Sequence, residues 1–242
     1  MNNHLSFRSG NPALNKSTFN SFVSTSDSRM TLEGTVNKTG ISLLLLMISA
    51  SVSWHGQLLM FIPIGFIFGI ILALVTVFKR EWSSITVPLY AIFEGLALGG
   101  VSIIFNNMYP GIVSQAIFLT FGILGALLLA YKTGLIKPTE NLKLGIAAAT
   151  GGIAVIYFVN FIMGFFGSGI PLIHSSSPMG IAFSLVVVLI AAFNLVLDFD
   201  FIEEGAEKGA PKYMEWYGAF GLLVTLIWLY LEILRLLSKL RR

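Results

Sequence analysis

Two apolar segments that carry acids decide the fold of this chain: NLVLDFDF at residues 194–201 and LYLEILR at residues 229–235. Each belongs to a run of about 20 apolar residues, the length that a helix needs to cross a membrane. A carboxylate at that depth costs about 2.5–3.5 kcal/mol on insertion scales, so such acids usually face a partner, a water-filled cavity or an ion path. We therefore interpret the rest of the chain as the wall around these acids.

The composition indicates an integral membrane protein. Of the 242 residues, 55% are hydrophobic and 11% are charged, whereas a soluble domain has about 25% charged residues. The net charge of +3 comes from basic residues at the ends of apolar runs, so we expect a lipid bilayer and no nucleic acid as partner. The chain has no cysteine, and its three histidines have no metal-ligand spacing. We therefore expect no cofactor, and the sequence indicates no particular protein partner.

Seven apolar stretches predict an all-α polytopic domain over residues 35–242, after a polar tail over residues 1–34. The tail has no periodic apolar pattern, so we expect it to be mostly disordered and cytoplasmic. Docking of the tail across the mouth of the bundle is the alternative. The chain lacks the alternating segments of a membrane barrel, so the spans must be helices. The predicted spans cover about residues 37–54, 57–78, 85–105, 112–131, 144–165, 180–201 and 217–237.

The positions of Lys and Arg predict the orientation of the spans. These residues precede the first span and follow spans two, four and six, and the other three connections have none. Because cytoplasmic loops are enriched in Lys and Arg, we expect a multi-pass protein of the inner (plasma) membrane with a cytoplasmic N-terminus. A full last crossing then puts the basic residues of 239–242 outside. The alternative is a last segment that enters and returns, but its unbroken apolar run favours a full crossing.

Small residues at a spacing of four predict where helices pack closely. Gly65 and Gly69 form one such pair, and Gly95 and Gly99 form another. Without a side chain, the backbones of two helices can approach each other closely, which favours helix association in lipid. We expect these contacts within one bundle rather than between two copies of the chain.

Polar residues inside the spans are the candidate site. Glu94 lies near the middle of span three, either as a neutral carboxyl bonded to a carbonyl or as part of an ion or proton path. Asn194 and Asp198 are four residues apart, so they share one face of span six. Asp200 faces elsewhere on that helix, and its simpler interpretation is a solvated acid at the cytoplasmic end.

Glu232 is the candidate acid of span seven, and Arg235 follows it by three residues. An ion or pH role for Glu232 competes with a local ion pair between these two residues, in which Arg235 extends to the membrane interface. Both interpretations stay open, and Arg235 remains an ion-path candidate with Glu94 and Asn194.

Four motifs, in this order along the chain, resemble the Bax inhibitor-1 family, also called transmembrane Bax inhibitor motif proteins, and within it a bacterial branch. They are SGNPAL at residues 9–14, YAIFEGLALGG at residues 90–100, LDFD at residues 197–200 and LYLE at residues 229–232. The resemblance implies seven helices with the last one surrounded by the other six. It also implies a pH-sensitive latch between one acid of span six and one of span seven, and Ca²⁺ conduction in some members. Eukaryotic relatives are tied to suppression of cell death.

The resemblance assigns the latch to Glu232 on span seven, where the family usually has Asp. On span six it points to Asp200 by motif, while helix geometry favours Asp198, so we keep both. If the chain turns at residues 209–211, hairpin counting places Glu232 opposite about residue 188, which is about 15 Å from the level of Asp198. A direct latch would then need a long or irregular connection.

These observations predict a pH-sensitive cation leak, with Ca²⁺ suggested by the resemblance. Two carboxyls that share a low-dielectric site titrate as a coupled pair, and carboxylate oxygens are ligands that Ca²⁺ prefers. The alternative is a non-conducting regulator or scaffold that binds other membrane proteins. We expect no enzymatic activity, because the spans contain neither a serine–histidine pair nor a Gly-x-Gly-Asp motif.

Overall fold

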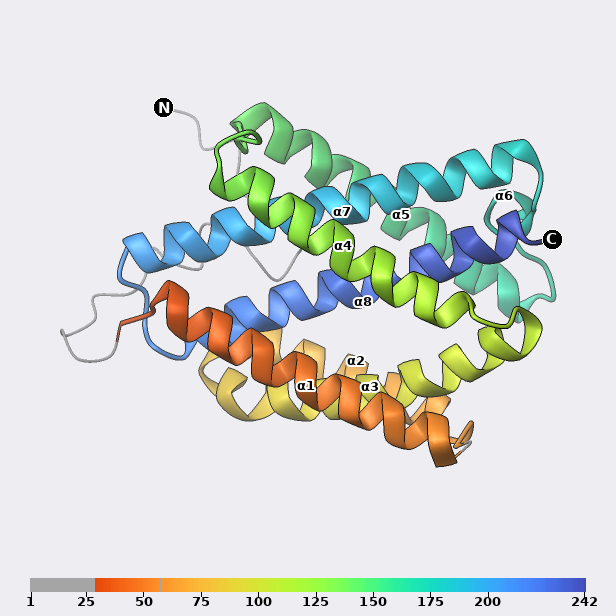
Figure 1. The fold of residues 1–242 in the computed structure, drawn as a ribbon, viewed down its shortest axis with the longest axis horizontal. Helices are drawn as coiled ribbons and strands as arrows, with labels where there is room; N and C mark the ends of the chain where they lie inside the picture. Colours follow the sequence, from red (N-terminus) through yellow and green to blue (C-terminus); the bar gives the residue numbers. More distant parts are fainter. Residues whose placement is uncertain (1–28, 57) are drawn as a thin grey trace. The chain divides into compact units, whose positions relative to one another are not determined.

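The computed structural model describes residues 29–56 and 58–242, and these residues form helices and connections without a strand. The all-α fold class predicted from the sequence is therefore confirmed. The elements are α1 (Leu32–Gly56), α2 (Phe61–Phe78), the short 3₁₀ helix η2 (Arg80–Trp82), α3 (Ser83–Met108), α4 (Ile112–Lys132), α5 (Glu140–Phe165), α6 (Pro171–His174), α7 (Pro178–Glu207) and α8 (Met214–Leu240) (Figure 1).

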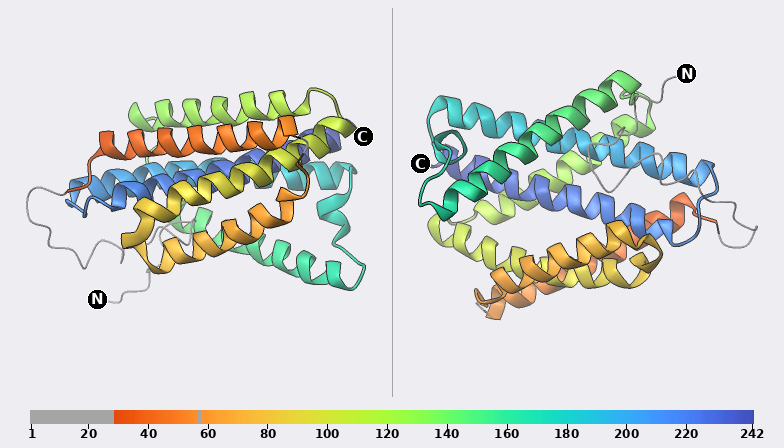
Figure 2. Two further views of the ribbon diagram at one scale, coloured as in Figure 1. Left: turned by 90° about the horizontal axis from the view of Figure 1, so that it is seen from below. Right: turned by 180° about the vertical axis from the view of Figure 1, so that it is seen from behind.

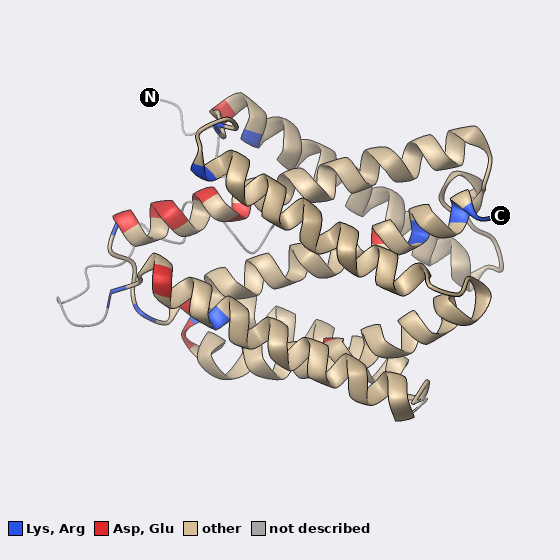
Figure 3. Cartoon of the chain, viewed as in Figure 1, with Lys and Arg blue, Asp and Glu red and all other residues tan. Residues whose placement is uncertain are grey.

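Seven of these helices, α1 to α5, α7 and α8, are long and apolar enough to cross a membrane. The shortest, α2, has 18 residues, which corresponds to about 27 Å at 1.5 Å per residue. The chain is thus a multi-pass membrane protein. Figure 3 shows the charged residues mostly at the helix ends and connections, while the middles of the helices are almost entirely uncharged. This distribution is the one that a hydrocarbon core requires.

Several helices extend beyond the spans predicted from apolar runs. The helix α1 begins at Leu32, α7 continues to Glu207, and α8 runs from Met214 to Leu240. An apolar run marks only the part of a helix inside the hydrocarbon, whereas Glu, Lys and Ala are good helix formers that continue it into the interface. The sequence analysis also gave no sign of α6, which begins with a proline at its first position.

The predicted polar tail, residues 1–34, lies outside the described residues up to position 28, and its last residues belong to α1. Leu32 to Gly34 are already helical, and Thr31 caps α1 by accepting a hydrogen bond from the N–H of Gly34 at 3.0 Å. Just before the cap, the N–H of Met30 donates to the carbonyl of Ala210 at 2.6 Å. The chain entering α1 is therefore attached to the connection between α7 and α8.

The chain divides into two compact units. Among the described residues, one unit comprises 29–110 and 200–224, and the other comprises 111–199 and 225–242. The long helices α7 and α8 contribute to both units. We call them the α1–α3 unit and the α4–α6 unit after the helices that each contains in full.

In the α1–α3 unit, α3 packs against both α1 and α2, and Figure 2 shows these three helices from two sides. The predicted small-residue pairs lie in these contacts. A Cβ atom at Gly65 would lie 2.5 Å from the carbonyl oxygen of Phe93, and one at Gly95 would lie 2.8 Å from the Cβ of Ser49. Gly99 similarly faces α1, since its Cβ would lie 2.8 Å from that of Ser53. Only glycine allows the helices to approach this closely.

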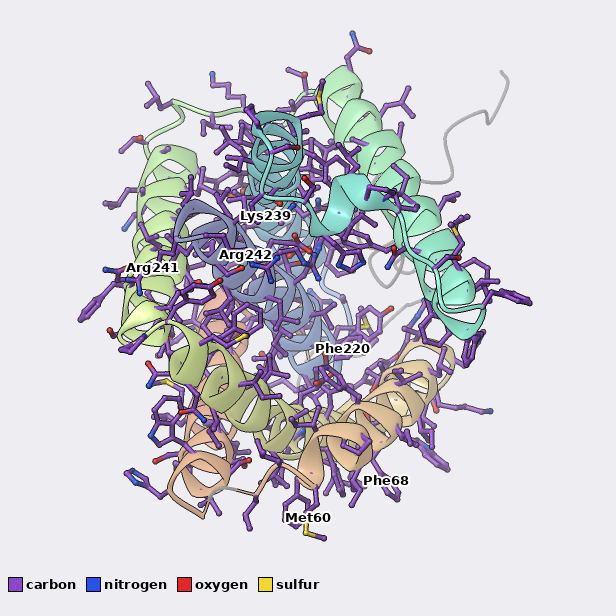
Figure 4. All side chains as sticks on the ribbon, turned by 90° about the vertical axis from the view of Figure 1, so that its right-hand side faces the viewer. Met60, Phe68, Phe220, Lys239, Arg241 and Arg242 are labelled. Atoms are coloured by element: carbon purple, nitrogen blue, oxygen red, sulfur yellow. The ribbon has the colours of Figure 1, made fainter. Side chains whose placement is uncertain are left out.

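The helices differ in how much of their surface the protein encloses. The apolar windows of α3, α7 and α8 are 61%, 56% and 61% buried, whereas those of α1, α2, α4 and α5 are 11–17% buried. Exposed apolar side chains include Phe68 of α2 and Met60, the residue just before α2, and both are labelled in Figure 4. A strongly enclosed α8 is what the family resemblance implies, and its central position stays a prediction.

The last segment is one unbroken helix of 27 residues, which is about 40 Å long. A segment that enters the membrane and returns would need a break, so that alternative is wrong for α8. The helix is long enough to cross the hydrocarbon core in full.

Candidate functional site

The three acids predicted to lie deepest in the membrane are all enclosed by protein. Glu94 in α3 is 7% exposed, Asp198 in α7 is 0% exposed and Glu232 in α8 is 1% exposed. Asp200 is half-buried. None of the first three carboxyls faces lipid, which is the orientation that the cost of an ionised group in hydrocarbon requires.

Glu232 belongs to a network of three side chains within the α4–α6 unit. The hydroxyl of Tyr157 on α5 donates to both carboxylate oxygens of Glu232, at 3.0 Å from each. The Nη1 of Arg235 donates to Glu232 Oε1 at 2.6 Å and to the hydroxyl oxygen of Tyr157 at 2.7 Å. The guanidinium also lies over the Tyr157 ring, with Cζ 5.1 Å from the ring centroid.

The local ion pair between Glu232 and Arg235 was one of the two interpretations left open by the sequence, and the structure contains it. Tyr157 was missed. A signal was available, because a tyrosine hydroxyl in the middle of a membrane span needs a hydrogen-bond partner. The sequence alone could not say which polar group on another helix would supply it.

The network is enclosed unevenly. The side chain of Glu232 is 2% exposed, while that of Arg235 is 35% exposed. One negative and one positive charge compensate each other, which lowers the cost of keeping the carboxylate in the membrane. The carboxylate is therefore enclosed within the unit, whereas the side chain of Arg235 is partly exposed at its surface.

Asp198 and Glu232 lie at different levels along their helices. The connection between α7 and α8 occupies residues 208–213, with Gly209 in the left-handed conformation at φ 64°. Asp198 precedes the end of α7 by nine residues, and Glu232 follows the start of α8 by 18 residues (207 − 198 and 232 − 214). At 1.5 Å per residue the two levels differ by about 14 Å. Counting along the observed helices thus gives an offset close to the one expected from hairpin counting.

Asn194, one helical turn before Asp198, connects α7 to α5. Its amide nitrogen donates to the hydroxyl of Thr150 on α5 and to the carbonyl of Ile190, both at 2.8 Å. Its amide oxygen is buried and accepts no hydrogen bond from the described residues. Asn194 precedes Asp198 by one helical turn, so oxygen acceptors recur on this face of α7.

Glu94 occupies a space that a glycine leaves open. A Cβ at Gly69 would lie 2.9 Å from Glu94 Oε1, so the carboxyl lies against α2 at a residue that has no side chain. The Oε2 atom is buried and has no hydrogen-bond partner among the described residues. If Glu94 were a neutral carboxyl bonded to a carbonyl, which is one of the two interpretations of the sequence, its carboxyl would need a hydrogen-bond partner here.

A fourth buried acid, Glu215, was not predicted from the sequence. Glu215, in the first turn of α8, has a side chain that is 0% exposed and pairs with Lys38 of α1 and with Lys212, the latter at 2.8 Å. It also accepts hydrogen bonds from the N–H and hydroxyl of Thr31, at 2.9 and 2.8 Å. Glu215 therefore attaches the start of α1 to the start of α8.

The basic C-terminus is bound within the α4–α6 unit. Lys239 is 4% exposed, and its Nζ donates to the carbonyl of Gly180 at 2.9 Å. Arg241 donates to Gln115 of α4 at 2.8 Å. Figure 4 shows Lys239, Arg241 and Arg242 together at the C-terminal end of α8. The distribution of Lys and Arg between the loops does not explain basic residues at the C-terminal end of α8. The contacts of Lys239 and Arg241 give a structural reason for them.

Among residues 29–56 and 58–242, no group of three or more His, Cys, Asp or Glu side chains could hold a metal ion. A cation at Glu232 or Asp198 would therefore take most of its ligands from water, amide or phenol oxygens.

Comparison with known families agrees with the resemblance seen in the sequence. A family model described as Bax inhibitor 1 like matches residues 11–242. A search of curated proteins finds no match. The family match covers nearly the whole chain, including all seven membrane-spanning helices. This protein therefore belongs to the Bax inhibitor-1-like family of multi-pass membrane proteins.

Proposed function

We propose that this protein is a pH-sensitive cation leak of the Bax inhibitor-1 type, with Ca²⁺ as the conducted ion, gated by carboxyls on α7 and α8. The observation that carries this proposal is the Glu232 network. A carboxylate that is 1% exposed lies at membrane depth, beside an arginine that is only partly enclosed. Buried ionisable residues in membrane spans mark ion and proton pathways more often than structural positions.

The mechanism follows from the two ionisation states of Glu232. When ionised, the carboxylate attracts Arg235 and accepts from the Tyr157 hydroxyl, which ties α5 to α8. Protonation removes the charge that attracts the guanidinium, so it weakens this tie. The proton thus changes how firmly two membrane helices are held together.

Asp198 contributes on α7 as a second protonation site. Because its level differs from that of Glu232 by about 14 Å, we propose that the two acids act through movement of the α7–α8 pair rather than through a direct shared proton. Asp200 remains the other candidate on α7. Asn194 and Glu94 supply further oxygen atoms that are buried and without a hydrogen-bond donor in the described part of the chain.

We further propose that the protein lies in the inner membrane of a bacterial cell with its N-terminus in the cytoplasm. Lys and Arg occur in the connections after α2, α4 and α7. Residues 56–61, 109–111 and 166–177, which join the other helices, contain none. The bias of basic residues toward cytoplasmic loops supports this orientation.

The test is Ca²⁺ flux into proteoliposomes that contain only the purified protein, measured across a series of pH values. Glu232→Gln, Asp198→Asn, Asp200→Asn and Glu94→Gln are compared with the wild type, each checked for folding by circular dichroism. The proposal expects pH-dependent flux that Glu232→Gln and at least one α7 variant alter. Folded wild-type protein without flux at any pH would instead support a non-conducting regulator or scaffold.

A further inference from the structure

The guanidinium of Arg235 occupies the place that a bound cation would take at Glu232. The carboxylate receives hydrogen bonds from only two residues of the described chain, Tyr157 and Arg235. Tyr157 contributes an oxygen beside both carboxylate oxygens, at 3.0 Å from each. Glu232 Oε1 and the Tyr157 oxygen thus both accept from one positively charged group, and oxygen is the ligand atom that Ca²⁺ and other hard cations use.

Arg235 can leave this place without any movement of a helix. It lies three residues after Glu232 on the same helix, so a change of side-chain rotamer is sufficient. Its side chain is 35% exposed, whereas that of Glu232 is 2% exposed. The ring of Tyr157, with its centroid 5.1 Å from Cζ, provides a second contact for the guanidinium in its present position.

A further charged group on α8 is Lys239, which donates to a backbone carbonyl and leaves the place at Glu232 to Arg235. Lys239 lies seven residues after Glu232 on α8, about 10 Å along the helix axis. Its Nζ donates to the carbonyl of Gly180 at 2.9 Å. Tyr157 is the titratable group that faces the carboxylate from α5.

We propose that Arg235 is a tethered counter-cation that fills the cation position of Glu232, and that a free cation binds there only when Arg235 swings out. Tyr157 is the positioning residue, because its hydroxyl is hydrogen-bonded to both the carboxylate and the guanidinium. The consequence for transport rests on the proposed leak function, but the exchange of one cation for another at Glu232 can be measured without transport.

The experiment follows thermal unfolding of the purified protein in detergent, with Ca²⁺ as the probe and choline as the control cation. The wild type should melt at the same temperature with either salt. Arg235→Gln should melt lower in choline and should gain about 5–10 °C in Ca²⁺ at roughly 100 times the dissociation constant. Arg235→Lys should restore the wild-type behaviour, because it returns a tethered cation. The double variant Glu232→Gln/Arg235→Gln should lose the Ca²⁺ response.

Arg241→Gln is the matched control, since it removes another arginine near the end of α8, one that donates to Gln115 of α4. It should show no Ca²⁺ response. If Arg235→Gln does not fold, Tyr157→Phe gives the same information, because it keeps the ring and removes the hydroxyl that holds the guanidinium. The Tyr157→Phe variant should respond to Ca²⁺ less strongly than Arg235→Gln. The wild type should not respond.

A folded Arg235→Gln or Tyr157→Phe protein with no Ca²⁺ response would overturn the inference, as would a response that survives in the double variant. Proteoliposome flux separates this result from the proposed function. Ca²⁺ binding by Arg235→Gln without flux in any variant would refute the leak and support the counter-cation. Flux in the wild type, unchanged in a folded Arg235→Gln variant that binds no Ca²⁺, would support the leak and refute the counter-cation.

Discussion

Removing the charge of Glu215 should detach the start of α1 from the start of α8. The substitution Glu215→Gln keeps the shape of the side chain and removes the negative charge that pairs with Lys38 and Lys212. It also weakens the acceptor for the N–H and hydroxyl of Thr31, the residue that caps α1. The effect is a stability change in the α1–α3 unit, which contains every residue of this cluster.

The size of the effect depends on where the remaining charges can go. Removing one partner of a buried ion pair costs about 3–5 kcal/mol when the other charge stays buried. The side chains of Lys38 and Lys212 are 18% and 51% exposed, so both can turn toward water and reduce that cost. Weaker capping of α1 contributes up to about 2 kcal/mol. We expect Glu215→Gln to lower the free energy of unfolding by about 2–3 kcal/mol.

The assay is reversible unfolding in mixed micelles, titrated with SDS and followed by circular dichroism. A double-mutant cycle with Lys38→Met isolates the coupling between the two side chains. The control is Glu204→Gln, whose pair with Lys208 at 2.6 Å is more exposed and should contribute only about 0.3–0.5 kcal/mol. If Glu215→Gln is no more destabilising than Glu204→Gln, the attachment of α1 through Glu215 is refuted.

Two further predictions concern helix packing and the span-six face. Gly95→Val places carbon atoms against Ser49 and the carbonyl of Leu46. It should therefore destabilise the protein by about 1–3 kcal/mol through overpacking. An unchanged SDS midpoint would contradict the close contact of α1 and α3. Thr150→Val removes the hydroxyl that accepts a hydrogen bond from Asn194. It should lower the free energy of unfolding by about 1–3 kcal/mol, measured in the same titration. A neutral effect would show that this hydrogen bond contributes nothing to stability.

Much of the fold could be predicted from the sequence because membrane insertion depends on local composition. An apolar run of sufficient length must be helical in lipid, so the seven spans and the break near residues 209–211 follow directly. The helix ends do not, since residues such as Glu203 to Glu207 continue α7 into the polar interface. The small helix α6 lies in a connection, where no apolar run marks it.

The site could be predicted only where its contacts are local. Glu232 and Arg235 are three residues apart on one helix, so their ion pair was foreseeable. Tyr157 lies 75 residues from Glu232 along the chain, and Lys38 lies 177 residues from Glu215. Contacts of this kind depend on how helices pack, which one sequence does not reveal. In the sequence, Lys38 indicates only the topology of the first span, and nothing near it points to Glu215.

The close packing at the small residues was foreseeable for a different reason. A spacing of four places two glycines on one face of a helix, which marks a surface that another helix can approach. Gly69 has an additional role that the spacing could not show. It leaves room for the carboxyl of Glu94, so one residue serves both packing and the accommodation of a buried acid.

The central claim, that Glu232 is the pH-sensitive group of a cation leak, is tested most directly by Ca²⁺ flux through wild-type and Glu232→Gln protein in liposomes across pH. We expect wild-type flux to change with pH and the flux of Glu232→Gln to be independent of pH over the same range. Identical pH profiles for the two folded proteins would contradict the claim.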